Sequence, residues 1–208
     1  VMYMQLDARP RSGMMAGVCS SAYAGAMKNR STLPWIEVAP DAPYFVTEHG
    51  EDWTPIGQND AISWVDLAGL LHRRDLRAVE HYLQTLQRSG VTTLRLMLEY
   101  SQDTNYYLER PTGIMRPELV RLWDDLFTLC ERFGLRILLT PYDTFWMWLN
   151  WDQHPYNCKN GGPCADRSQW LLCKDTRAAI KARLAFAIER WGGSGALFAW
   201  DVCNELHP

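Results

Sequence analysis

The segment near the end of the chain reads Phe198-Ala199-Trp200-Asp201-Val202-Cys203-Asn204-Glu205. It begins as an apolar run with poor alternation, which is typical of a strand that is buried on both faces. The run stops abruptly on two adjacent polar residues, Asn204 and Glu205. Because the functional side chains of parallel α/β proteins lie at the carboxyl ends of the strands, this pattern predicts a site at the tip of a buried strand.

A helix followed by a glycine and then a strand is predicted three times in succession. Apolar residues at three- and four-residue spacing predict helices at 74–88, at 117–133 and from Thr176 onward, and glycine follows each of them at Gly90, Gly134 and Gly192. Apolar strands are predicted after each helix, at 91–98, 135–140 and 196–203, and an earlier strand ends at Gln58-Asn59. Such alternation predicts a parallel sheet of right-handed βαβ units, covered on both faces.

Four βα units are half of a (β/α)8 TIM barrel, and we predict an α/β fold of this kind, truncated to its first four βα units. A half barrel exposes two strand edges and an apolar interior, so we expect the C-terminal half of the barrel to be missing from this sequence. The alternative is a small open parallel α/β sheet, although no GxGxxG or phosphate loop follows the first strand. The predicted domains are a leader or disordered segment at 1–33 and the half barrel at 34–208. A hairpin formed by 35–38 and 44–47 is expected to plug the bottom of the barrel.

The composition of the chain limits which binding partners and which cellular locations are expected. The net charge is -3 and no basic patch stands out, which argues against nucleic acid or an anionic membrane as a partner. No run is long and apolar enough to span a membrane. Residues 9–26 have features of a degraded signal peptide, so we expect a secreted or extracytoplasmic protein, with a disordered leader and a cytoplasmic location as the alternative. The spacing of Cys158 and Cys164 allows a local disulfide, whereas the scattered cysteines and histidines predict no metal site and no cofactor.

Glu205 is the leading catalytic candidate. Hydrolysis of an acetal requires one carboxyl group that protonates the departing oxygen and a second that attacks or activates water. A half-buried strand end beside aromatic rings can raise the pKa of such an acid through desolvation. Asn204 can hydrogen-bond a substrate hydroxyl without competing for the proton, provided that a bulge lets both neighbours face the site. The alternative is a helix cap or a surface Asn-Glu pair.

This segment resembles the acid/base strand of the retaining (β/α)8 glycoside hydrolases, in the large clan that includes the family 5 cellulases and mannanases. The resemblance covers about residues 44–208 and implies that Glu205 is the general acid/base and that Asn204 binds the sugar 2-hydroxyl. It also matches Arg95 to the arginine that lies near the nucleophile in that clan. An arginine inside an apolar strand requires a carboxylate partner on physical grounds as well. The family's nucleophile is a glutamate at the end of the seventh strand, so the resemblance identifies no nucleophile within this chain.

The loop after the third predicted strand, residues 141–173, is rich in aromatic residues. Trp146 and Trp148 are candidates for stacking on pyranose rings, and Asp143 and His154 for hydrogen bonds to sugar hydroxyls. His207 follows Glu205 closely and is a further candidate for lining the site.

The predicted function is that of a retaining O-glycosyl hydrolase, cellulase-like or mannanase-like, acting on a β-linked polysaccharide or oligosaccharide. The alternative is a non-catalytic carbohydrate-binding or scaffold protein, for which the aromatic loop would suffice. A barrel enzyme of unrelated chemistry, such as an aldolase or a metal-dependent hydrolase, would need a Schiff-base lysine or a histidine cluster. The predicted strand ends contain no lysine, and the histidines are dispersed.

Overall fold

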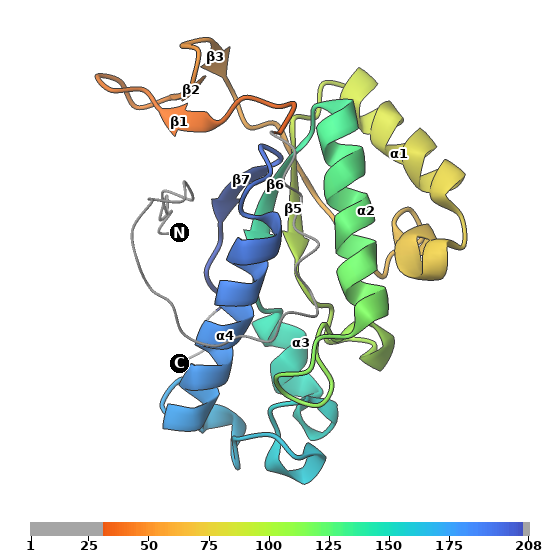
Figure 1. The fold of residues 1–208 in the computed structure, drawn as a ribbon, viewed down its shortest axis with the longest axis vertical. Coiled ribbons are helices and arrows are strands. Elements are labelled where there is room, and N and C mark those ends of the chain that lie inside the picture. Colours follow the sequence, from red (N-terminus) through yellow and green to blue (C-terminus); the bar gives the residue numbers. More distant parts are fainter. Residues whose placement is uncertain (1–30, 206–208) are drawn as a thin grey trace.

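A four-stranded parallel sheet organises the computed structural model, which describes residues 31–205 (Figure 1). Its strands are β4 (Gly57–Asn59), β5 (Thr93–Met97), β6 (Arg136–Thr140) and β7 (Leu197–Trp200). They lie in the order β4-β5-β6-β7, each paired in parallel with its neighbour along the chain. This sequential order confirms the predicted parallel sheet. β7 ends three residues before the predicted limit of 203, so Asp201 to Glu205 lie beyond the strand.

Three long helices connect these strands: α1 (Leu76–Arg88), α2 (Pro117–Phe133) and α4 (Lys174–Trp191). The side chain of Asp75 caps α1 by accepting a hydrogen bond from the amide of Ala78. Gly134 ends α2 in the left-handed conformation, with φ of 70°, which costs glycine little. α4 begins two residues before the predicted Thr176, because Cys173 has an extended backbone and Thr176 is already buried inside the first turn.

The helices cover one face of the sheet. Leu94 pairs in register with Ile137, both side chains are fully buried, and they belong to the main core together with residues from α1, α2 and α4. On the other face, Arg95, Met97 and Leu138 are only half-buried. Thr93, Arg136 and Thr140 on the same face are buried, so the predicted coverage of both faces fails only at Arg95, Met97 and Leu138 within residues 31–205. Coverage of one face with sequential strand order favours the barrel arrangement over a doubly wound sheet, in which helices cover both faces.

The centre of the core is aromatic. The rings of Phe127 and Trp191 stack with centroids 5.9 Å apart and planes 4° apart, and Trp123 packs against both. The indole Nε1 of Trp123 donates a hydrogen bond of 2.9 Å to the carbonyl of Leu98, just after β5. This bond satisfies the polar atom of a fully buried ring and fixes α2 against the carboxyl end of the sheet.

The predicted hairpin is present and lies at the end of the sheet opposite α3 (Thr144–Leu149) (Figure 1). It consists of the antiparallel strands β1 (Ile36–Val38), β2 (Phe45–Thr47) and β3 (Asp52–Trp53). The pairing of β6 with β7 skips Phe198, and the ring of this bulged residue packs on Phe45 and Trp53, with centroids 5.1 and 4.7 Å away. The bulge thus joins the hairpin to the sheet.

The end of the predicted leader belongs to the folded part of the chain. The hydroxyl of Ser31 donates to Glu131 of α2 at 2.9 Å and accepts from the amide of Gly195 at 2.7 Å. Leu33 packs against the main core. Residues 1–30, including the predicted signal-like segment 9–26, lie outside the described residues.

Short helices, rather than irregular loop, fill residues 141–173. They are α3 and the 3-10 helices η3 (Trp151–Gln153), η4 (Cys158–Asn160) and η5 (Arg167–Gln169). Two further 3-10 helices, η1 (Ala68–Arg73) and η2 (Thr104–Tyr106), lie in earlier connections of the chain. They enclose a second, smaller core cluster that includes Tyr142 and Tyr156. The spacing of Cys158 and Cys164 allows a disulfide, but both cysteines are free in the structure, and a backbone hydrogen bond of 2.8 Å joins them. None of the helices within residues 31–205 has the length and apolarity needed to cross a membrane.

Candidate active site

Polar side chains from all four parallel strands meet at the carboxyl edge of the sheet. Arg95 of β5 is the centre of this network. Its Nη2 atom lies 2.7 Å from Oδ2 of Asp201 and 2.8 Å from Oδ1 of Asn204, both beyond the end of β7. Its Nη1 donates to Oδ1 of Asn59, the last residue of β4, at 3.2 Å. Thr140, the last residue of β6, donates its hydroxyl to Oδ2 of Asp201 at 3.1 Å.

The strand register explains why these groups converge. Asn59 pairs directly with Arg95, so both side chains point to the face of the sheet that the helices leave open. The neighbours of Arg95 along the strand, Leu94 and Leu96, point into the core. Asp201 supplies the carboxylate that an arginine in an apolar strand requires, and the pair is partly exposed, at 29% for Arg95 and 17% for Asp201. The network therefore fixes the chain just beyond β7.

Asn204 and Glu205 differ in burial. Asn204 is buried, with its amide oxygen held by Arg95, whereas the side chain of Glu205 is exposed. The exposure of Glu205 thus differs from the predicted half-buried strand end. The backbone of Glu205 has φ of 43°, and its carbonyl accepts a hydrogen bond of 3.2 Å from the hydroxyl of Thr144. This left-handed turn takes the place of the predicted bulge in breaking the alternation between the two residues.

The Arg95–Asp201 pair allows a prediction for stability. Replacing Asp201 with Asn removes the charge that accepts from Arg95 and Thr140 and should lower the free energy of unfolding by about 1–2 kcal/mol, a figure reduced for solvent screening. Urea unfolding followed by tryptophan fluorescence measures the change. Asp125→Asn is the matched control, since Asp125 has similar exposure (16%) but pairs with the more exposed Arg73. Equal losses in the two variants would contradict a special role for the Arg95 network.

Asp143 lies beneath this surface. It follows β6, is 1% exposed, and caps α3 by accepting a hydrogen bond of 3.3 Å from the amide of Trp146. Burial raises the pKa of Asp143 to about 6, and the charges of Glu99 and Glu205 add to the shift, while the amides of Trp146 and Ser101 oppose it. A side chain this deeply buried does not reach a sugar at the surface, which corrects the prediction that Asp143 binds a hydroxyl.

A fully buried ionic cluster lies behind Asp143, centred on Arg183 of α4. Its Nη2 atom lies 3.0 Å from Glu99, which follows β5, and 2.6 Å from Glu109. Tyr156 donates a hydrogen bond of 2.9 Å to the same oxygen of Glu109, and the guanidinium lies 4.3 Å from the centroid of the Tyr142 ring. Burial alone would raise the pKa of Glu99, but Arg183 and His154 more than offset this effect and hold it at about 2.

His154 belongs to this cluster and not to the surface. It is 0% exposed, its Nδ1 accepts a hydrogen bond from the amide of Tyr156 at 3.1 Å, and its Nε2 lies 3.3 Å from Glu99. An Nδ1 that accepts carries no proton, so this arrangement assigns the neutral tautomer, which donates from Nε2 to Glu99. Both ring nitrogens are thus engaged inside the protein, which corrects the prediction that His154 binds a sugar hydroxyl.

The two candidate tryptophans are half-buried on α3. Trp146 packs partly against the main core, and its ring meets the exposed Phe145 edge to face at 5.2 Å. The guanidinium of Arg167 covers one face of Trp148, at 4.3 Å from the centroid. A sugar could therefore stack on Trp148 only from its other face. His207 lies outside the described residues.

Sequence reasoning missed three members of the network, Asn59, Thr140 and Asp201, as partners of Arg95. Asn59 was visible as the end of a predicted strand and Asp201 as a nearby carboxylate. Only the register of the strands shows that both face Arg95. Within residues 31–205, no group of three or more His, Cys, Asp or Glu side chains is arranged to hold a metal ion.

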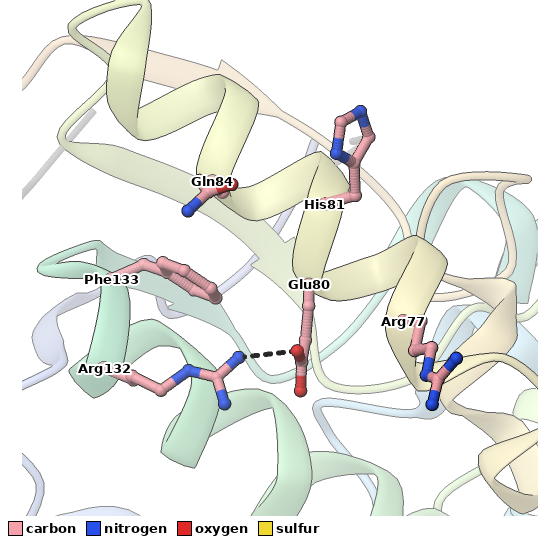
Figure 2. Close-up of a pocket in the computed structure, with 6 residues that line it drawn as sticks. All are labelled: Arg77, Glu80, His81, Gln84, Arg132 and Phe133. Carbon is pink, nitrogen blue, oxygen red and sulfur yellow. Dashed lines mark ion pairs between the residues drawn. The ribbon is translucent and has the colours of Figure 1, made fainter.

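A pocket of about 470 Å³ lies elsewhere, on the outer surface of α1 and α2 (Figure 2). Its lining residues are Arg77, Glu80, His81, Gln84, Arg132 and Phe133. The ion pair of Arg132 with Glu80, at 3.0 Å, crosses it, and both side chains are largely exposed. Because these residues lie on the helical layer and not at the carboxyl edge of the sheet, the pocket is separate from the candidate site.

Comparison with known proteins reveals a fold but no close relative. No model of a protein family matches the chain. A search of curated proteins likewise finds no match.

Solved structures do match. A family 5 glycoside hydrolase mannosidase from Rhizomucor miehei has a TM-score of 0.55 and 15% identity, over 83% of this chain and 49% of that one. An exo-beta-1,4-mannosidase from Opitutaceae bacterium strain TAV5 has a TM-score of 0.56 and 15% identity, over 78% of this chain and 27% of that one. An endo-beta-1,4-mannanase from Thermotoga petrophila has a TM-score of 0.56 and 16% identity, over 77% of this chain and 36% of that one.

At 15–16% identity these matches establish a shared fold and nothing finer. The chain spans half or less of the length of each of these structures. The chain thus shares the fold of a part of these structures. The predicted truncation of a complete barrel stays a prediction.

Proposed function

We propose that this chain carries the acid/base half of a retaining O-glycosyl hydrolase that acts on β-linked saccharides. One observation carries the proposal: Arg95 holds Asn204 at the carboxyl edge of a parallel sheet, directly before an accessible glutamate. The carboxyl edge is where enzymes with parallel barrels place their chemistry. The shared fold supports the assignment without establishing it.

Glu205 is the proposed general acid/base. Its carboxyl group would protonate the departing glycosidic oxygen and, as the carboxylate, later take a proton from the attacking water. Asn204 would donate its amide hydrogens to the sugar 2-hydroxyl, because Arg95 occupies its amide oxygen and so orients the amide group. Arg95 and Asp201 are the proposed positioning residues.

None of the carboxylates within residues 31–205 is proposed as the nucleophile, the second carboxylate that a retaining mechanism requires. Asp201 is engaged by Arg95, Glu99 by Arg183, and Asp143 is buried. We propose that the nucleophile and four further βα units come from polypeptide outside residues 31–205, packed on the open face and free edges of the sheet. In this arrangement the half-buried Met97 and Leu138 become part of a closed barrel interior.

A β-linked mannan is the proposed first substrate, since the matched structures are a mannosidase, an exo-beta-1,4-mannosidase and an endo-beta-1,4-mannanase. β-1,4-Glucan is the alternative, because the acid/base geometry does not distinguish the two sugars. An extracytoplasmic location is proposed on the signal-like segment 9–26.

The test is a direct assay of hydrolysis. The protein, together with whatever sequence its reading frame encodes beyond Pro208, is incubated with β-1,4-mannan, mannooligosaccharides and cellooligosaccharides. We expect new reducing ends, and proton NMR should show that the first product retains the β-anomeric configuration. Saturable binding of these glycans without turnover would reject the hydrolase and favour a non-catalytic carbohydrate-binding protein.

A further inference from the structure

Three carboxyl groups follow three neighbouring strands of the sheet, and the middle one has no assigned role. Glu99 follows β5, Asp143 follows β6 and Glu205 follows β7. Arg183 compensates the charge of Glu99, and His154 donates a hydrogen bond to it. Within residues 31–205, Asp143 has no ion pair with any cation. It is thus a buried acid whose ionisation would be uncompensated.

The local geometry of Asp143 is that of a fixed group. Its Oδ1 accepts from the amide of Trp146, and its Oδ2 is buried without a hydrogen bond among the described residues. The nearby amide of Ser101 offsets only part of the cost of ionising it. Leaving a buried carboxylate oxygen unpaired is costly, whereas a protonated carboxyl group avoids most of that cost. The raised pKa of Asp143, about 6, agrees with this reading of the geometry.

Asp143 is also linked to Glu205 through the chain. Thr144, the next residue, donates its hydroxyl to the carbonyl of Glu205 at 3.2 Å. Capping of α3 by Asp143 fixes the first turn, and therefore the position of Thr144. The left-handed backbone of Glu205, with φ of 43°, is unfavourable for a residue with a β-carbon and needs such support.

We propose that Asp143 is the positioning residue for Glu205: by capping α3 it fixes the Thr144 hydroxyl that holds the main chain of Glu205. The charges of Asp143 and Glu205 also interact, which couples the ionisation of Asp143 to Glu205. The catalytic meaning of this role rests on the proposed function, but the coupling itself does not. The ionisable groups that face Asp143 are Glu99, Tyr107 and Glu205. Glu99 and Glu205 carry negative charge when they ionise, so both favour the protonated form of Asp143, whereas burial raises the pKa of Tyr107 well above its ordinary value and keeps it neutral in this range.

The direction of the pH effect follows from the ionisation of Asp143. Below pH 6 its carboxyl group is mostly neutral. Above pH 6 Asp143 loses its proton, and the buried site beneath Glu205 acquires an uncompensated negative charge. Removing the charge of Glu205 should therefore make Asp143 more acidic. If the proposed function holds, the Asp143→Asn variant should lack the change in kcat/KM that the wild type shows near pH 6.

The experiment follows the Asp143 carboxyl carbon by NMR during a pH titration of the protein without sugar. We expect a wild-type midpoint near pH 6, and a midpoint lower by about half a pH unit in Glu205→Gln. Asp152→Asn is the matched control, because Asp152 is an exposed carboxylate (81%) in the same connection, and it should leave the midpoint unchanged. A wild-type midpoint near pH 4, or no shift in Glu205→Gln, would overturn the coupling.

A second readout tests the positioning role. Thr144→Val removes the hydroxyl that holds Glu205 and should displace the backbone amide signal of Glu205 without touching the cap. Asp143→Ala should displace the same signal, and Asp143→Asn, which keeps a capping oxygen, should restore it. An undisturbed Glu205 signal in Thr144→Val would overturn the positioning role. Because none of these measurements needs a substrate, the inference and the proposed function can fail separately.

Discussion

Replacing Glu205 with Gln lowers kcat on unactivated β-mannosides by about 10²–10⁴-fold, if Glu205 is the general acid/base. Gln cannot donate a proton to the departing sugar oxygen, so the loss falls on the step that needs the acid. An aryl glycoside with a strongly acidic phenol as leaving group departs without protonation, and its first step should be nearly unaffected. The two substrates are compared in the same preparation by steady-state and burst kinetics.

The control for this comparison is Glu51→Gln, an exposed glutamate in the hairpin at the opposite end of the sheet. It should retain the wild-type rates on both substrates. Wild-type turnover of the unactivated substrate by Glu205→Gln would remove Glu205 from the mechanism. An equal loss in the first step on both substrates would indicate damage to binding and not the loss of an acid.

The second large effect concerns stability. Replacing Arg183 with Met should lower the free energy of unfolding by about 3–5 kcal/mol, because it leaves Glu99 and Glu109 buried without their cation. That is a large share of the roughly 5–15 kcal/mol that stabilises an ordinary domain. The measurement is urea unfolding at pH 7. Arg132→Met, which breaks the exposed pair with Glu80, is the control and should cost less than about 1 kcal/mol.

The pH dependence of the Arg183 variant has a defined sign. In the wild type the pKa of Glu99 is depressed to about 2 from the ordinary 4.5, so its contribution to stability is present above pH 4.5 and is lost as the pH falls toward 2. In Arg183→Met the buried carboxylate is destabilising, and protonation relieves it. The difference in the free energy of unfolding between the wild type and Arg183→Met should therefore narrow as the pH falls below 4.5. A gap that stays constant down to pH 3 would show that Arg183 acts through packing alone.

The arrangement of strands and helices could be predicted from sequence because local signals agree with it. The periodic apolar residues of α2, with Pro117 at its start and Gly134 after its end, fix that helix without any tertiary information. Burial on one face of the sheet could not be predicted in this way. Leu138 and Met97 are as apolar as the core leucines, and only the three-dimensional placement of the helices shows which face they cover.

The site could be predicted where a buried charged residue requires a partner of opposite charge. Arg95 in an apolar strand required a carboxylate, and the structure supplies Asp201. The roles of Asp143 and His154 could not be read from the aromatic loop in which they occur. Their burial depends on the folding of residues 141–173 over Glu99 and Arg183, which are distant in sequence.

The proposed function requires a glycosidic bond to lie against the side chain of residue 205, and a crystal structure tests this most directly. The Glu205→Gln variant, in the protein that includes any sequence encoded beyond Pro208, would be crystallised with a β-1,4-linked mannooligosaccharide. We predict a side-chain atom of residue 205 within about 2.6–3.2 Å of a glycosidic oxygen, with the amide of Asn204 on the 2-hydroxyl of the adjoining sugar. A saccharide bound elsewhere, with residue 205 out of hydrogen-bonding reach of every glycosidic oxygen, would contradict the account.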